Sequence, residues 1–236
     1  MRETICLRGR SISYELTRKP VKNINLRVRA DGSVGVSASP QIPLEEIERV
    51  LRAKEEFLLR ALDRFAAQPV LPDPGDYAAG AVVFLLGRPY RVVLYQGNEN
   101  CVQQTGNILR LTVTDPDCAA LRKQTMEACL QALCLEVTQD LCRQHQPALA
   151  PLGVPLPQIR VRSMRSRWGS CQPGKGRVTF ARQLLQAPFS CVEYVVCHEL
   201  VHFVHLNHAK AFYDRLAQIL PDWKARRQRL NTPGTW

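Results

Sequence analysis

Four of the five histidines in this chain of 236 residues fall within residues 198–208. The segment opens with His198-Glu199-Leu200-Val201-His202, inside an apolar run that predicts a helix. Residues four apart lie on one face of a helix, so the two imidazoles can converge on a single metal ion. Glu199 stands beside them and can reach a water molecule held there. This H-E-x-x-H spacing is typical of zinc peptidases.

Two further observations support a metal-binding helix. Ser190-Cys191-Val192-Glu193 has the Ser-x-x-Glu spacing of a capping box, which predicts that the helix opens there. At the His and Glu frequencies of this chain, H-E-x-x-H arises by chance in roughly one such chain in 200. A packed core pair is therefore a poor explanation of His198 and His202.

A catalytic zinc takes three protein ligands and keeps a fourth position for water, so a third ligand is needed. His205 lies about 10 Å along the axis from His198 if the helix continues, too far to share one ion. His205 is therefore expected to pack or to support a ligand. His208 can fold back if the helix ends near residue 206, where Asn207 tolerates the left-handed conformation. An exposed turn histidine is the alternative for His208, and Asp214 is the weaker rival ligand.

The rest of the chain predicts an α+β protein divided by a linker. The apolar patterns predict short strands within residues 11–38, with an Asp-Gly hairpin turn, and then a helix over 43–66. Residues 68–80 hold three prolines and two glycines and predict a linker between lobes at 1–67 and 81–236. Further strands are expected at 81–86, 89–95, 108–114, 158–164 and 177–181, with a long helix from about 115 to 145 and a loop through Gly169. No internal repeat is recognised.

The net charge of +11 is concentrated near the end of the chain. Residues 1–150 hold 19 Lys and Arg against 17 Asp and Glu, a balance of +2, whereas residues 151–236 hold 13 against 4, a balance of +9. A basic third predicts an acidic partner such as nucleic acid, although a solvated surface is the commoner meaning. No apolar run reaches the roughly 18 residues of a membrane span, and no signal core is present. Nine cysteines without a C-x-x-C pair suggest reduced thiols in the cytoplasm.

Several segments together resemble the YgjP-like predicted metal-dependent hydrolases, which look like relatives of the SprT-like and WLM proteases. The resemblance is specific from about residue 158 to 230 and looser over the N-terminal part. It implies a zincin-like domain, with an active-site helix and a small antiparallel sheet, beside an N-terminal β-hairpin and helix lobe. It also implies that zinc is held by His198, His202 and His208, with Glu199 as catalytic base. The matching segments are 165–171 (Arg-Ser-Arg-Trp-Gly-Ser-Cys), 178–180, 194–202, His205, Asn207-His208 and Phe212.

The resemblance further implies a cleft bordered by a strand at 158–164 or 177–181, with residues 165–171 nearby. An extended peptide can add to such a strand edge. Cys171 is a weak candidate to approach the metal, and core packing is the expectation for Trp168 and Trp223.

Three functions are compatible with these residues. The first is a zinc metallopeptidase in which a metal-activated water attacks the peptide bond, Glu199 acts as general base, and a nearby Tyr or Arg helps the metal to stabilise the oxyanion. The second is a hydrolase of a small amide or another non-peptide bond, which needs the same groups. The third is a nucleic-acid-associated protein or protease that uses the basic C-terminal third.

Overall fold

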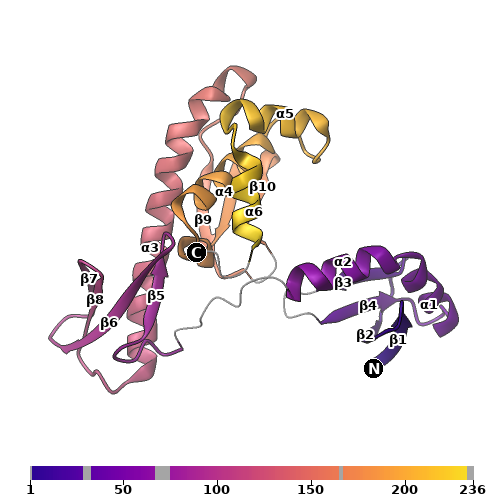
Figure 1. Ribbon diagram of the computed structural model, residues 1–236, viewed down its shortest axis with the longest axis horizontal. Helices are drawn as coiled ribbons and strands as arrows, with labels where there is room; N and C mark the ends of the chain where they lie inside the picture. Colours follow the sequence, from indigo (N-terminus) through magenta and orange to yellow (C-terminus); the bar gives the residue numbers. More distant parts are fainter. Residues whose placement is uncertain (1, 29–32, 67–74, 165–166, 233–236) are drawn as a thin grey trace. The chain divides into compact units, whose positions relative to one another are not determined.

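The computed structural model describes residues 2–28, 33–66, 75–164 and 167–232, which form two compact units, residues 1–68 and 69–236 (Figure 1). Of the predicted linker at 68–80, residues 68–74 lie outside the described residues, and 75–80 form turns. Gly80 adopts φ 84°, a conformation that glycine reaches without strain. No helix among the described residues has both the length and the apolar character needed to cross a membrane.

The first unit is a four-stranded sheet followed by two helices. Its strands β1 (Arg2–Leu7), β2 (Arg10–Arg18), β3 (Asn25–Val28) and β4 (Val34–Ala38) lie in the order β1-β2-β4-β3. Ile12, Tyr14 and Leu16 of β2 are buried and the residues between them are exposed, which is the pattern of a sheet with one face against a core. Val28 pairs with Val34 across the predicted hairpin, whose turn at residues 29–32 lies outside the described residues. Strand β1 was not predicted.

The predicted helix over 43–66 is two helices, α1 (Leu44–Ala53) and α2 (Glu55–Ala66). Lys54 leaves the helical conformation at φ −106° and ψ 18°, and its N–H is shared between the carbonyls of Val50 and Leu51. Leu58 N–H still bonds to Lys54 O at 3.0 Å, so only one residue is irregular. Ile47, Leu51 and Leu58 stay on one buried stripe, which is why the sequence pattern does not reveal the break.

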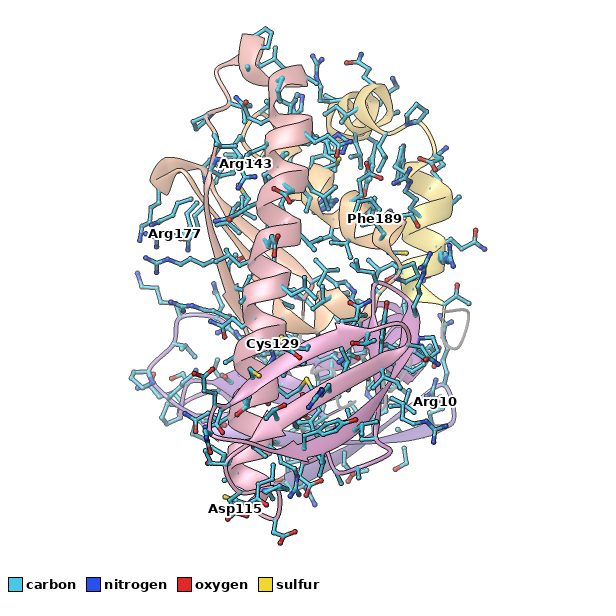
Figure 2. All side chains as sticks on the ribbon, turned by 90° about the vertical axis from the view of Figure 1, so that its left-hand side faces the viewer. Arg10, Asp115, Cys129, Arg143, Arg177 and Phe189 are labelled. Atoms are coloured by element: carbon cyan, nitrogen blue, oxygen red, sulfur yellow. The ribbon has the colours of Figure 1, made fainter. Side chains whose placement is uncertain are left out.

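The second unit begins with another four-stranded sheet, β5 (Val82–Leu85), β6 (Arg88–Gln96), β7 (Cys101–Thr105) and β8 (Ile108–Val113). The strands predicted at 81–86, 89–95 and 108–114 are present, and β7 was missed. The long helix α3 (Ala119–His145) follows and packs on β7, β8 and the later strand β9 (Gln158–Arg162) (Figure 2). Its buried residues, among them Met126 and Leu130, join the sheet in one apolar core.

The two four-stranded sheets have the same topology, a structural repeat that the sequence does not reveal. Their orders are β1-β2-β4-β3 and β5-β6-β8-β7, each with two hairpins whose inner strands run parallel. Each first hairpin turns through a residue and a glycine that both have positive φ, Arg8-Gly9 and Leu86-Gly87. The flanking residues also match, as Leu7 and Arg10 correspond to Leu85 and Arg88. The shared signal is too short to stand out from the sequence.

A third sheet adjoins the helices of the second unit. It contains β10 (Gly169–Gln172), β11 (Arg177–Ala181) and β9 in the order β10-β11-β9. The α+β class is confirmed, but this sheet is mixed rather than antiparallel, because β9 and β11 pair in parallel and β10 pairs antiparallel to β11. Strand β10 falls in a predicted loop, since its four residues show no strand-like alternation.

The main core of the second unit surrounds α4 (Phe189–Val201), with α5 (Lys210–Ile219) and α6 (Trp223–Asn231) packed near it. Nine of the 13 residues of α4 are buried, so little of this helix faces water. Trp223 is buried in this core and Trp168 packs against it, as predicted. Four short 3-10 segments complete the unit, η1 (Gln146–Ala148), η2 (Ala150–Leu152), η3 (Pro173–Lys175) and η4 (Arg182–Gln186).

Candidate metal centre

Helix α4 begins at Phe189, immediately after Pro188, and no side chain caps it. The predicted capping box at 190–193 is therefore wrong. Cys191 N–H already bonds to Pro188 O at 2.8 Å, which places Ser190 inside the helix. Glu193 instead pairs with His145 Nε2 at 2.8 Å and with Arg226 Nη1, joining α4 to α3 and α6.

The turn between β5 and β6 supports the start of α4. Leu86 N–H donates to Leu185 O at 2.7 Å, and Gly87 N–H donates to Gln186 O at 3.2 Å. Gly87 has φ 80°, and a Cβ there would lie 2.9 Å from Pro188 Cα. Only glycine combines that backbone conformation with so close an approach. The second copy of the repeated hairpin thus contacts the segment immediately before the helix of the candidate metal centre.

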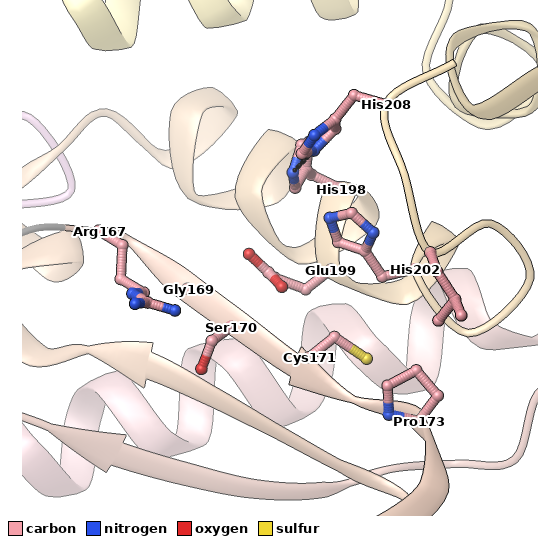
Figure 3. Close-up of a pocket in the computed structure, with 10 residues that line it drawn as sticks. Arg167, Gly169, Ser170, Cys171, Pro173, His198, Glu199, His202 and His208 are labelled. Carbon is pink, nitrogen blue, oxygen red and sulfur yellow. Dashed lines mark hydrogen bonds between the residues drawn. The ribbon is translucent and has the colours of Figure 1, made fainter. Parts of the chain in front are cut away.

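Three histidines converge at the other end of α4 (Figure 3). His198 lies on the last turns of α4, His202 at its C-cap and His208 on the returning turn before α5. One ring nitrogen from each lies within 4.8 Å of the other two, and the Nε2 atoms of His198 and His208 are 3.0 Å apart. The helix ends at Val201, earlier than the predicted residue 206, and Asn207 does not adopt a positive φ. The chain reverses through residues 202–209 instead.

His202 is held in one tautomer by the turn that follows it. Its Nδ1–H donates to His205 O at 3.0 Å, which leaves the Nε2 lone pair available to a metal. His205 therefore contributes its backbone carbonyl. Phe212, fully buried on α5, contacts the rings of all three histidines, with centroid separations of 4.8–4.9 Å. Phe212 was noted only through the family resemblance, and no periodicity in the sequence assigns it this role.

The donor set fits a transition-metal ion. Burial, together with the neighbouring imidazoles of His202 and His208, lowers the pKa of His198 to about 3. Burial also lowers the pKa of His202. Both rings are therefore neutral near pH 7 and retain a lone pair. Neutral imidazoles are ligands that suit Zn, Cu, Fe and Ni. The cluster of His198, His202 and His208 could therefore bind a metal.

Glu199 lies beneath these rings, only 5% exposed. Burial raises the pKa of this carboxyl to about 8, while the Arg167 charge and a hydrogen bond from the Cys171 backbone act to lower it. Strand β10 passes so close that a Cβ on Gly169 would lie 2.7 Å from Glu199 Oε1. Gly169 is thus the residue that lets the strand approach the carboxylate.

A cleft of about 460 Å³ opens onto these groups (Figure 3). Residues on both pleat faces of β10 line it, so the edge of that strand borders the cleft. This corrects the expectation that residues 158–164 or 177–181 form the bordering strand, because β9 and β11 lie behind β10 in the sheet order. The lining residues are Arg167, Gly169, Ser170, Cys171, Pro173, His198, Glu199, His202, Leu206 and His208.

Other candidate side chains lie at the margin of the site. The Cys171 thiol lines the cleft, but burial raises its pKa to about 12, so it stays protonated. The ring centroid of Tyr194 is 5.9 Å from that of His198, and burial raises the Tyr194 pKa to about 12. Tyr213 stacks on Trp223 at 4.8 Å, and Lys210 pairs with Asp214, the rival ligand, on the exposed side of α5.

Comparison with known proteins yields one family. A family model described as YgjP-like, metallopeptidase domain, matches residues 22–233. The match includes β3 and β4 of the first sheet, the whole of the second four-stranded sheet and the long helix α3. It also includes all three histidines of the cluster. No curated protein gave a significant match to the chain.

Proposed function

Because the chain belongs to the YgjP-like metallopeptidase family, we propose that it is a zinc-dependent peptidase with Glu199 as its general base. The observation that carries this proposal is the convergence of three imidazoles and one buried carboxylate on a single open cleft. Three neutral ligands leave zinc its full positive charge. Zinc bound there supplies Lewis-acid chemistry, acidifying a water molecule and polarising the scissile carbonyl.

The role of Glu199 is to carry a proton between the attacking water and the leaving amine. Its carboxylate accepts the water proton and then returns it to the amine nitrogen as the peptide bond breaks. Burial raises the pKa of this carboxyl, which makes it a stronger base, while the positive charges of Arg167 and of a bound metal act to keep it ionised. The Cys171 backbone hydrogen bond and Gly169 fix where this carboxylate sits.

The border of the cleft supports a peptide rather than a small amide as the substrate. Strand β10 is at the edge of its sheet, and its far side pairs with β11. An edge strand offers backbone donors and acceptors to which an extended peptide can add, and on β10 the Cys171 N–H among them is bonded to Glu199. A small substrate needs an enclosing pocket, whereas this cleft is open along the strand.

Peptide hydrolysis and metal content test the proposal together. Wild type, Glu199→Gln and His208→Ala are loaded with zinc and assayed on a library of internally quenched peptides, with zinc counted by elemental analysis. We expect about one zinc per chain in wild type and Glu199→Gln, loss of zinc in His208→Ala, and hydrolysis by wild type alone. His205→Ala is the matched control, because only its backbone oxygen supports the site. Full turnover by zinc-loaded Glu199→Gln would overturn the assignment.

A second candidate function, nucleic-acid binding, is favoured by one face of the β9-β11-β10 sheet. Arg160 and Arg162 share a face of β9, and Arg177 pairs with Gln158 on that same face. The opposite face carries the buried Val161 and the residues of β11 that enter the core. None of the three strands contains an acidic residue, and the Arg177 side chain is visible beside this sheet in Figure 2.

Salt dependence tests this second candidate. Phosphate contacts release counterions, so the affinity of wild type for a DNA duplex should fall steeply between about 50 and 200 mM salt. Replacing Arg160, Arg162 and Arg177 by alanine should reduce the slope of log Kd against log salt by roughly one per arginine. Binding that is insensitive to salt, or unchanged in the triple variant, would exclude this face.

A further inference from the structure

The two ends of the cleft differ in chemistry (Figure 3). Arg167 lies at one end and Pro173 at the other, with Glu199 and the three histidines between them. Leu206 also lines the cleft and is 78% exposed, more than any other large hydrophobic residue described. One end is therefore cationic, the other carries the apolar Pro173, and Leu206 adds a second apolar side chain to the lining.

The Arg167 guanidinium acts on Glu199 through its charge, but it is exposed and has hydrogen-bond donors available for a ligand. The structure gives its exposed side chain no ion pair or hydrogen bond with any described residue. The only acidic residue lining the cleft is Glu199, which is buried and bonded to the Cys171 backbone. A guanidinium binds a carboxylate through two parallel hydrogen bonds, which makes carboxylate the anion it recognises best among peptide groups.

The opposite end offers contact without charge. Leu206 sits on the turn between His202 and His208, so the loop that brings in the third ligand also presents this side chain. Pro173 follows β10 and also lines the cleft, so the lining holds two apolar side chains besides the residues of β10. An apolar side chain seated there removes the leucine from water, which stabilises the complex.

The direction of a bound peptide follows from the strand. Strand β10 runs from Gly169, near Arg167, to Gln172, next to Pro173. Antiparallel pairing is the more stable arrangement for a short added strand. A peptide lying antiparallel on this edge runs from the Pro173 end to the Arg167 end, so its C-terminal side reaches the arginine.

We propose that the cleft selects peptides with a carboxylate on the C-terminal side of the scissile bond, bound by Arg167, and an apolar residue on the N-terminal side, bound by Leu206 and Pro173. This inference rests on the proposed peptidase function. The carboxylate is either an Asp or Glu side chain or the terminal α-carboxylate of a short peptide.

Matched peptides separate the two sources of carboxylate. The assay uses quenched peptides with Asp, Asn or Lys after the scissile bond, each made with a free C-terminal acid and with a C-terminal amide. The zinc-loaded full chain is incubated with each peptide, and mass spectrometry identifies the bond that is cleaved. We expect kcat/KM to favour carboxylate-bearing peptides by about tenfold, the factor equivalent to about 1.4 kcal/mol. Arg167→Gln should abolish this preference, and Arg167→Glu should turn it toward Lys. Arg162→Glu, equally a charge reversal but outside the cleft, should leave it intact.

Binding without turnover provides an independent readout. Zinc-loaded Glu199→Gln is titrated with the same peptides, and binding is followed by fluorescence anisotropy. Adding Leu206→Asn should lower the affinity for peptides with an apolar residue about tenfold without altering the preference for carboxylate. Adding Leu156→Asn, the control, should change neither the affinity nor the preference. Hydrolysis with no preference for carboxylate, or a preference that survives Arg167→Gln, would overturn this inference alone. Failure of zinc-loaded wild type to cleave any peptide would overturn the proposed function as well.

Discussion

Replacement of Gly169 by alanine tests whether the position of the Glu199 carboxylate controls turnover. The added Cβ would lie 2.7 Å from Glu199 Oε1, 2.8 Å from its Cγ and 2.9 Å from its Cδ. Ordinary contact begins near 3.4 Å, so the carboxylate must retreat by about 0.7 Å, which is 3.4 minus 2.7. Glu199 is only 5% exposed, and packed atoms oppose that movement.

The expected cost falls on chemistry more than on metal binding. A displacement near 1 Å at a reacting group costs about a hundredfold in rate, so kcat of Gly169→Ala should fall by roughly that factor. Overpacking should lower the free energy of unfolding by about 1–3 kcal/mol. The zinc content should stay at the wild-type value, because the three atoms nearest to the new methyl group all belong to Glu199 and none to a histidine.

The assay measures initial rates on a cleaved quenched peptide, zinc by elemental analysis, and urea denaturation on the same preparations. Gly174→Ala is the matched control, because a Cβ there has no neighbour within 4 Å and its φ is not left-handed. In the double variant Gly169→Ala/Glu199→Gln, kcat should equal that of Glu199→Gln alone, since both changes act through one carboxylate. Wild-type kcat in zinc-loaded Gly169→Ala would refute the reasoning.

Three further predictions follow from the supports of the metal helix. Gly87→Ala should lower the free energy of unfolding by about 2 kcal/mol, because Gly87 has φ 80° and lies against Pro188. Denaturant titration measures this loss. Gly106→Ala is the control and should cost less, because Gly106 also has a positive φ but has no neighbour within 4 Å of an added Cβ. Burial acts to raise the pKa of the Glu193 carboxyl, but hydrogen bonds from Arg226 and His145 outweigh burial, so the pKa is lowered from 4.5. The ionised carboxylate therefore stabilises the folded protein above pH 4.5, and this stabilisation is lost as the pH falls through the folded-state pKa. Glu193→Gln should cost about 2 kcal/mol at pH 7 and flatten the acid limb of the stability profile; an unchanged acid limb would contradict this. Chelation of zinc from the wild type should lower its melting temperature, as seen by calorimetry, but should leave that of His208→Ala unmoved.

Local patterns along the chain predicted much of this protein. The i, i+4 spacing of His198 and His202 places both rings on one side of α4 wherever that helix packs. Apolar patterns along the sequence predicted most strands of both four-stranded sheets. A long stretch without proline or glycine predicted the helix that the structure shows with 27 residues. These features depend on neighbours within one or two turns, so the sequence carries them directly.

Tertiary structure alone decided the features that depend on distant partners. Strand β10 exists because β11 pairs with it, and its role beside Glu199 turns on the missing side chain of Gly169. The segment just before α4 is bonded to a hairpin about 100 residues earlier in the chain, and the helix starts after Pro188 rather than at the predicted capping box. The break at Lys54 and the parallel pairing of β9 with β11 are equally invisible in periodicity. Local spacing determines which face a side chain occupies, whereas strand partners, sheet edges and close backbone approaches are fixed only when remote segments compete for the same hydrogen bonds and space.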